Sequence, residues 1–215
     1  MSVPTVTIVT PWWNSPELAN GYLAAMGVGQ PEDVIVIDNG SLPPLTGPIA
    51  NHAKLSFRDN RGFAAACNAG LRAAETDAVV FLNNDVLPLG GDWLGPIRAL
   101  LRPGRFVGPD LRIDPHTAVD GRTLPYIDGW CLAGMRTDLL RLGGFDEDFE
   151  EPSYYGDNDL CVRARHAGFK LVQVNISLRH LGNYTSKSMD VTGVSVRNHR
   201  RYCEKVRALY APAAA

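Results

Sequence analysis

Two short runs made only of apolar residues constrain the fold of this chain more than any other feature. They are VIVI at residues 34–37 and AVVFL at residues 78–82. Apolar runs of this length, with no polar alternation, are typical of parallel strands that are covered on both faces. The two runs therefore predict a sheet with helices on each side.

Helical stretches stand between the predicted strands. Apolar spacing predicts helices over residues 16–26 and 63–74, while residues 5–10 and 54–57 have the composition of further strands. This βαβαβ order predicts an α/β fold with a doubly wound, mostly parallel sheet. The less regular second half predicts helices at 93–101 and 160–167, a short helix with Thr137 as its N-cap, and strands at 130–135 and 171–174.

The bulk properties fit one globular domain. Apolar residues make up 45% of the 215 residues, and the net charge of −2 gives no reason to expect nucleic-acid binding. No apolar run reaches the roughly 18 residues of a membrane span. The first residues, MSVPTVTIVT, lack the basic leader of a signal peptide, so a cytoplasmic protein is expected. The four cysteines have no zinc-knuckle spacing and are expected to be buried, reduced thiols.

Polar side chains follow two of the predicted strands directly. Asp38, Asn39, Gly40 and Ser41 come after VIVI, and the run Asn83-Asn84-Asp85 comes after AVVFL. Ligand sites of open α/β sheets lie beyond the carboxyl ends of the strands. All these residue types also form turns, which is the favoured interpretation of the first group. For the second group, a turn and a site for Mg²⁺ or Mn²⁺ are about equally supported, since both ions prefer oxygen ligands.

Other polar groups also allow two interpretations. In Asp157-Asn158-Asp159, before a predicted helix, one aspartate is expected to cap the helix and the other to face the site as a general base. Arg61 is either part of a solvated loop or a phosphate ligand, and a single histidine such as His180 is more often structural than a ligand.

Taken together, these segments resemble the family 2 glycosyltransferases, in particular their bacterial rhamnosyltransferase-like branch. The resemblance covers roughly residues 5–182. It rests on six pieces in order, namely TVTIVTPWWN, VIVIDNGS, NRGFAAACNAGL, VVFLNNDV, GGFDEDF followed by YYGDNDLCVRARHAGFKLV, and His180. The sequence departs from the family at Asn83, where the metal motif usually has an aspartate, and at Gly156, where a glutamate is common.

The resemblance implies a GT-A fold and an inverting transfer of a sugar from a UDP- or dTDP-type donor to an acceptor hydroxyl. It makes Asp157 the catalytic base and implies Mn²⁺ or Mg²⁺ at a metal site of Asp85, Asn83 and His180. The implied nucleotide-binding residues are Pro11, Trp12, Asn14, Asp38, Asn39, Arg61, Asn68 and Asn84. Trp130 and Asp159 are the implied acceptor-binding residues. Trp12 or Trp13 is a candidate to stack on the base, with a buried packing role at least equally supported.

Other functions remain open at this point. A nucleotide-sugar-binding protein would keep Asp38 and Asp85 but need no base. A nucleotidyltransferase needs a glycine-rich loop after the first strand, and PWWNSPEL is not one. A Rossmann dehydrogenase is disfavoured because no G-x-G-x-x-G follows that strand. The acceptor itself, whether saccharide, lipid-linked or protein, is not indicated.

The chain is expected to divide into a GT-A domain at residues 1–182 and a basic helical extension at 183–215, packed on the same domain. Residues 195–210 contain five basic residues against the single acid Glu204, with apolar residues at helical spacing. A terminal helix docked on the domain is the favoured interpretation. The alternative is a basic face that meets a membrane surface peripherally or contacts a partner subunit or a second copy.

Overall fold

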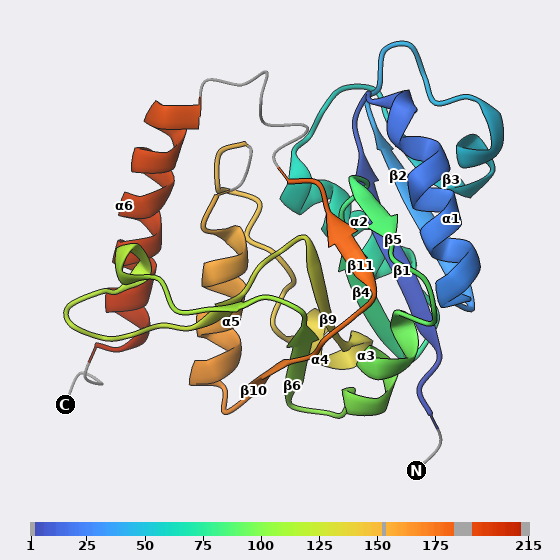
Figure 1. Ribbon diagram of the computed structural model, residues 1–215. Helices are drawn as coiled ribbons and strands as arrows, with labels where there is room; N and C mark the ends of the chain where they lie inside the picture. The colour runs from blue at the N-terminus through green and yellow to red at the C-terminus, as the bar shows by residue number, and fades with distance from the viewer. Residues whose placement is uncertain (1–2, 152–153, 183–190, 212–215) are drawn as a thin grey trace.

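This computed structural model describes residues 3–151, 154–182 and 191–211. Its body is a central sheet of seven strands, seen in Figure 1. The strand order is β10-β6-β9-β4-β1-β2-β3. The strands are β1 (Val6–Trp12), β2 (Asp33–Asn39), β3 (Ala53–Phe57), β4 (Ala78–Leu82), β6 (Arg105–Gly108), β9 (Cys131–Met135) and β10 (Lys170–Gln173). All neighbours pair in parallel except β9, which runs antiparallel to both β4 and β6. The predicted α/β fold with a mostly parallel sheet is confirmed.

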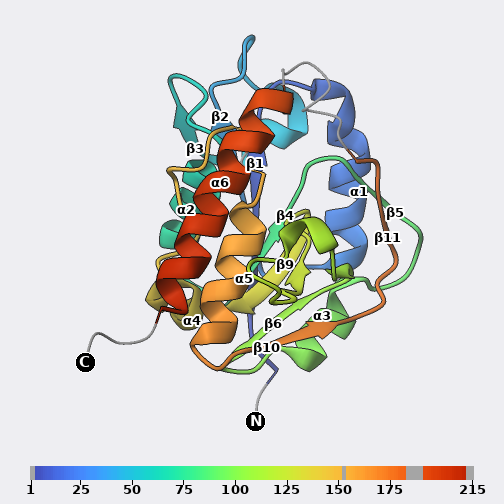
Figure 2. The same cartoon turned by 90° about the vertical axis from the view of Figure 1, so that its left-hand side faces the viewer.

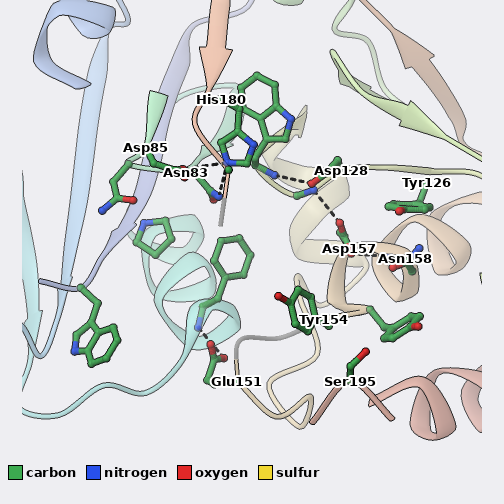
Figure 3. A pocket seen from close by; sticks show the side chains of 18 of the residues that line it. Asn83, Asp85, Tyr126, Asp128, Glu151, Tyr154, Asp157, Asn158, His180 and Ser195 are labelled. Atoms are coloured by element: carbon green, nitrogen blue, oxygen red, sulfur yellow. Dashed lines mark hydrogen bonds and ion pairs between the residues drawn. The ribbon is translucent and has the colours of Figure 1, made fainter. Parts of the chain in front are cut away.

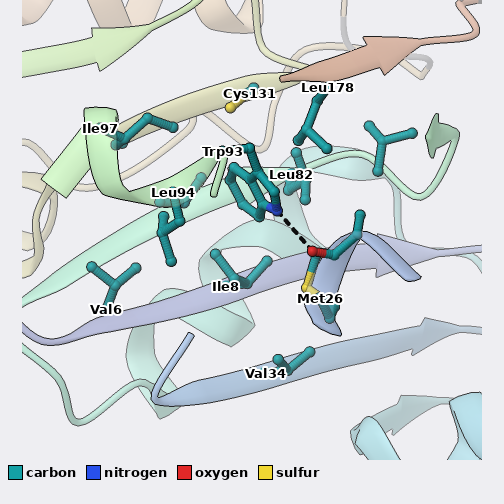
Figure 4. Close-up of a cluster of buried hydrophobic side chains, with 14 of the residues drawn as sticks. Val6, Ile8, Met26, Val34, Leu82, Trp93, Leu94, Ile97, Cys131 and Leu178 are labelled. Atoms are coloured by element: carbon teal, nitrogen blue, oxygen red, sulfur yellow. Dashed lines mark hydrogen bonds between the residues drawn. The ribbon is translucent and has the colours of Figure 1, made fainter. Parts of the chain in front are cut away.

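Helices cover both faces of the sheet, as the two apolar runs require. On one face α1 (Ala19–Gly29) and α3 (Leu94–Leu100) pack against the even-numbered residues of the central strands, such as Ile8 and Val80. Figure 4 shows Trp93 at the centre of this layer, where its Nε1 donates a hydrogen bond of 2.8 Å to the carbonyl of Ala25. On the other face α2 (Phe63–Ala73), α4 (Arg136–Arg141) and α5 (Gly156–His166) pack against residues such as Val9 and Phe81.

Two small antiparallel ribbons lie outside the main sheet. One pairs β5 (Val86–Pro88) with β11 (Leu178–His180), and the other pairs β7 (Leu111–Arg112) with β8 (Tyr126–Ile127). Within the described residues, 3-10 turns lie at Pro16–Leu18, Gly47–His52 and Pro115–Thr117. The ribbons matter for function because they bring distant parts of the chain to one edge of the sheet.

Two sequence predictions about helix starts are wrong. Thr137 is not an N-cap, because β9 continues directly into α4 while Met135 still pairs with Ala78, so the helix begins at Arg136. The helix predicted from residue 160 begins at Gly156 instead. Tyr155 precedes it with a φ of 72°, in the left-handed region that aromatic side chains rarely adopt.

The C-terminal helix α6 (Val191–Leu209) lies beside α5 in both views (Figures 1 and 2). Tyr202 and Val206 are buried with Val162 of α5 in a third apolar cluster. Its basic side chains form ion pairs with acidic residues of the domain, namely Arg197 with Glu150, Arg201 with Asp146 and Asp148, Lys205 with Asp146 and Asp159, and Arg207 with Asp120. These pairs favour the docked-helix interpretation. The predicted domain boundary borders on residues 183–190, which lie outside the described residues.

Within the described ranges, no helix is both long enough and apolar enough to cross a membrane. All four cysteines are free thiols, and Cys67, Cys131 and Cys161 are buried while Cys203 is partly buried. The expectation of buried, reduced thiols therefore fits three of the four positions.

Candidate active site

A cavity of about 570 Å³ opens at the carboxyl ends of the central strands. Pro11 and Trp12 at the end of β1, Asn39 at the end of β2, and the three residues 83–85 after β4 contribute to its wall. The opposite wall comes from residues 112–130, from the start of α5 and from Ser195 of α6. Figure 3 shows Asp85, Asn83 and His180 on one side of this cavity and Asp157 with Asp128 on another.

The β5–β11 ribbon brings His180 to Asp85. His180 pairs with Val86 in the ribbon, and the amide of Leu181 donates a 2.9 Å hydrogen bond to the Asp85 carbonyl. The Nε2 atom of His180 then lies 3.1 Å from Asp85 Oδ1 and 3.4 Å from Asn83 Nδ2. Three side chains predicted as metal ligands are thus brought together.

The Asp85 carboxylate is suited to a cation. It is almost completely buried, and its Oδ1 lies near His180 Nε2 but accepts no hydrogen bond from the part of the chain that the structure describes. Burying a carboxylate oxygen that accepts no hydrogen bond is costly, and a bound cation would remove that cost. The described residues contain no group of three or more His, Cys, Asp or Glu side chains arranged to hold a metal. A cation here would therefore take its remaining ligands from a bound anion and water, as Mg²⁺ commonly does.

Trp130 packs on the imidazole of His180. The two rings are stacked with centroids 4.8 Å apart and planes 8° apart. The indole Nε1 donates a 2.8 Å hydrogen bond to Asp110 Oδ2, which fixes the ring in the cavity wall. Trp130, which the sequence predicts to bind the acceptor, thus orients the imidazole of His180.

Asp157 reaches the same cavity from the first turn of α5. Its Oδ2 accepts a 2.9 Å hydrogen bond from the amide of Gly129, and its Oδ1 accepts one of 2.9 Å from the amide of Asn158. Burial, followed by the nearby charge of Asp128, raises the pKa of Asp157 to about 7, although the hydrogen bonds oppose the change. A carboxyl group with a pKa near neutral is suited to accept a proton from a bound hydroxyl.

Two of the predicted nucleotide-binding residues, Asp38 and Asn14, form turns beside the cavity. Asp38 Oδ1 accepts a 2.9 Å hydrogen bond from the Ser41 amide, the pattern of a turn-forming aspartate. Asn14, with a φ of 54°, accepts from the amide of Leu42 at 2.8 Å. Asn39 does line the cavity, and its Nδ2 donates a 2.8 Å hydrogen bond to Asn60 Oδ1, which ties β2 to the loop before α2.

Five of the predicted site residues are not among the described residues that line the cavity: Asn14, Asp38, Arg61, Asn68 and Asp159. Arg61 lies over the ring of Phe57, 4.8 Å from its centroid. Asn68 bonds both the amide and the carbonyl of Phe145, and Asp159 pairs with Arg163 and Lys205. The polar groups of these side chains serve packing between elements, so their part in ligand binding stays a prediction.

The two adjacent tryptophans differ in position. The Trp12 side chain is fully buried edge-on against Tyr22, and its Nε1 donates to the carbonyl of Asn14. Trp13 lines the cavity and is only half-buried, so it is the one with a ring surface within reach of a ligand. Asn84, also predicted, is buried in the cavity wall.

Several cavity residues have no counterpart in the sequence predictions. They include Arg112, Asp114, Tyr126, Asp128, Glu151, Tyr154 and Ser195. Most lie in irregular segments or on α6, where no strand end marks them as part of a site. The pairing of β7 with β8, two residues each, is too short to be read from periodicity.

Comparison with known proteins places the chain in a defined group. The family model described as glycosyl transferase family 2 matches residues 7–149. Two curated relatives, each called pre-mycofactocin glycosyltransferase, come from Mycobacterium tuberculosis strains CDC 1551 / Oshkosh and ATCC 25618 / H37Rv. Each is 30% identical over 202 residues, covering 80% of this chain and 42% of the relative. The chain thus spans about two fifths of the length of the curated relatives it matches.

Solved structures share the fold at low identity. The mannosyltransferase PcManGT from Pyrobaculum calidifontis, in complex with GDP-Man and Mn²⁺, superposes with a TM-score of 0.62 at 17% identity, over 100% of this chain and 77% of that one. GalNAc-T7 with UDP, GalNAc and Mn²⁺ has a TM-score of 0.69 at 12% identity, over 94% of this chain and 48% of the other. These likenesses confirm the predicted GT-A fold.

Proposed function

The chain belongs to glycosyl transferase family 2, and we propose that it moves a sugar from a nucleoside diphosphate donor to an acceptor hydroxyl. The observation that carries the proposal is the presence in one cavity of two carboxylates with different environments. Asp85 has a buried oxygen suited to a cation, and Asp157 has a pKa near 7. Two acidic groups held in such different states are a recurrent basis for dividing chemical roles in an active site.

The Asp85 side of the cavity is proposed to hold the diphosphate of the donor. Mn²⁺ or Mg²⁺ bound to Asp85, Asn83 and His180 would neutralise the charge that develops on the leaving diphosphate. Trp130 keeps His180 in place by stacking, and Trp13 is proposed to contact the nucleoside. PcManGT is described with GDP-Man and GalNAc-T7 with UDP, each with Mn²⁺, which supports a nucleotide-sugar donor here. A UDP- or dTDP-type donor remains our specific expectation.

The Asp157 side is proposed to bind the acceptor. The acceptor oxygen attacks the anomeric carbon, the bond from that carbon to the diphosphate breaks on the opposite face, and the hydroxyl proton passes to Asp157. This sequence inverts the anomeric configuration. The amides of Gly129 and Asn158 hold the carboxylate by hydrogen bonds, so it needs little rearrangement to receive the proton.

A protein that only binds nucleotide sugars is the main alternative. Such a protein has no use for a buried carboxyl group with a pKa near neutral, which carries a cost in stability. Incubation of the donor with candidate saccharide, lipid-linked and protein acceptors separates the alternatives, because only a transferase forms a glycosylated product.

The free cysteines fit the reducing environment of the cytoplasm, where we propose to place the protein.

The direct test of the proposal is the binding of donor nucleotides to Asp85→Ala. We expect calorimetry to show that the parent binds UDP or dTDP with Mn²⁺ or Mg²⁺ and loses affinity with a chelator, and that Asp85→Ala is weak in both conditions. Asp148→Ala is the matched control, since this aspartate is exposed on the surface beside α6. Equal binding by parent and Asp85→Ala, with and without chelator, would contradict the proposal.

A further inference from the structure

A second carboxylate lies beside the proposed base. Asp128 directly precedes Gly129, whose amide donates the 2.9 Å hydrogen bond to Asp157 Oδ2. Both aspartates line the cavity, and Figure 3 shows their side chains close together. Two neighbouring carboxylates repel each other when both are ionised, so the charge state of one depends on what surrounds the other.

Arg112 provides the compensating charge. Its NH2 atom lies 2.9 Å from Asp128 Oδ2 and 3.8 Å from Asp110 Oδ2. The β7–β8 ribbon fixes this geometry, because Arg112 pairs with Tyr126, two residues before Asp128. Arg112 is about half exposed, and it also lines the cavity, so its interaction with Asp128 is accessible to a bound ligand.

We propose that Arg112 and Asp128 act as a pair of positioning residues that set, through their charges, how readily Asp157 takes the proton of the acceptor hydroxyl. The inference rests on the proposed role of Asp157 as the base. Arg112 acts only through Asp128, and Asp128 acts on Asp157 through its charge and through the short segment that carries the Gly129 amide.

The other titratable groups around Asp157 are neutral or already paired. Burial and then the charge of Asp157 raise the pKa of Tyr126 to about 12, so its hydroxyl stays neutral. Burial also raises the pKa of the Cys161 thiol, which lies one turn along α5. Asp159 on the same helix forms ion pairs with Arg163 and Lys205.

Two further acidic residues line the cavity, Glu151, whose Oε1 accepts a 2.8 Å hydrogen bond from the amide of Phe63, and Asp114. The Oδ1 of Asp114 accepts a 2.8 Å hydrogen bond from the amide of His116, which anchors it to the 3-10 turn at Pro115–Thr117. From α6, the residue that lines the cavity is the uncharged Ser195. After burial, the nearby charge of Asp128 is the cause that raises the pKa of Asp157.

The pair predicts pH shifts of opposite sign. Asp128→Asn removes a negative charge near Asp157, so the acid limb of the pH profile of kcat/KM for sugar transfer should move to lower pH. Arg112→Gln leaves the charge of Asp128 uncompensated, so the limb should move to higher pH. We expect each shift to be roughly half to one pH unit, at or below the 1–3 units of a directly contacting charge, because the arginine is half exposed.

The experiment measures kcat/KM for sugar transfer from pH 5 to 9 in the parent, Asp128→Asn, Arg112→Gln and the double variant. The double variant should follow Asp128→Asn alone, because Asp128, through which Arg112 is proposed to act on Asp157, is then neutral. Arg141→Gln is the control for a change of one unit in net charge, since this side chain pairs with Asp138 on α4.

The outcomes separate the inference from the proposed function. If the parent transfers no sugar to any acceptor, the proposed function fails. If the parent is active but both single variants leave the limb in place, or move it in the same direction, the inference is wrong. A shift of similar size in Arg141→Gln would also overturn it, because the effect would then follow net charge alone.

Discussion

Asp146, a partly buried carboxylate, contributes to the docking of α6, and Asp146→Asn tests this. The Asp146 side chain is 17% exposed and contacts Lys205 and, at 3.0 Å, Arg201. Burial alone would raise its pKa, but hydrogen bonds from Lys205, the Asp148 amide and Arg201 lower it from 3.8 to about 2. A shift of nearly two units corresponds to about 2.5 kcal/mol of stability. The two cations are partly exposed, so we expect a loss of about 1–2 kcal/mol at pH 7.

The sign with pH follows from the lowered pKa. The ionised carboxylate stabilises the fold fully above about pH 4, and this contribution is lost as the pH falls toward 2. Urea unfolding should therefore show a constant gap between parent and Asp146→Asn at pH 7 and 5, which narrows below pH 4.

Asp148→Asn is the matched control for this prediction. Asp148 contacts the same arginine at 2.7 Å, but its side chain is 76% exposed. An exposed pair contributes little, so we expect a loss of no more than about 0.5 kcal/mol. If the two variants lose the same free energy of unfolding, burial does not determine the strength of these pairs and the reasoning fails.

Two further predictions concern the base and the packing of the sheet. Asp157→Asn should keep donor affinity in calorimetry and lose roughly 100-fold or more in transfer rate. Because burial raises the pKa of Asp157 to about 7, ionisation of this carboxyl group destabilises the parent as the pH rises. The melting temperature of Asp157→Asn minus that of the parent should therefore increase from pH 5 to 8, and a constant difference would contradict this. Gly70→Ala should cost about 1–3 kcal/mol in urea unfolding, because the new Cβ would lie 2.3 Å from Val9 Cγ1. Gly27→Ala should gain about 0.5–1 kcal/mol, because its Cβ would have no described atom within 4 Å other than its chain neighbours and the backbone of its own helix. Changes of the same sign in the two glycine variants would show that the close approach of α2 to β1 does not limit packing.

The parts of the fold that the sequence predicts are those with local signals. The strand at residues 78–82 is observed with the predicted bounds, because a continuous apolar run can be satisfied only by burial on both faces. The stop at Gly143 and Gly144 also follows from local chemistry, since both adopt positive φ values after α4. Thr137 failed as a cap because strand pairing of Met135 with Ala78 determines where the helix starts, and that pairing is not visible locally.

The same contrast between local signals and long-range pairing applies to the residues of the candidate site. Asp85 and Asn83 could be found from sequence because they follow a strong strand, and the sheet itself brings strand ends together. Arg112 and Asp128 could not be found in this way. Their positions depend on the β7–β8 ribbon, and only the three-dimensional fold shows that Asp128 lies beside a carboxylate 29 positions further along the chain.

The helix α6 lies beyond the residues that the family model matches, yet it contacts the segment that carries the proposed base. The match covers residues 7–149, which include the strand ends and Asp85, whereas Asp157 and α6 lie beyond it. The helix that carries Asp157 starts after Tyr155, whose ring stacks 5.6 Å from that of Tyr202 on α6. Since α6 holds the residue at the start of α5 and also supplies Ser195 to the cavity, changes in this helix reach both the base and the acceptor wall. If the acceptor binds beside Asp157 as proposed, its wall combines Asp128 and Trp130 from within the family match with Asp157 and Ser195 from beyond it, so both parts of the chain bear on the choice of acceptor.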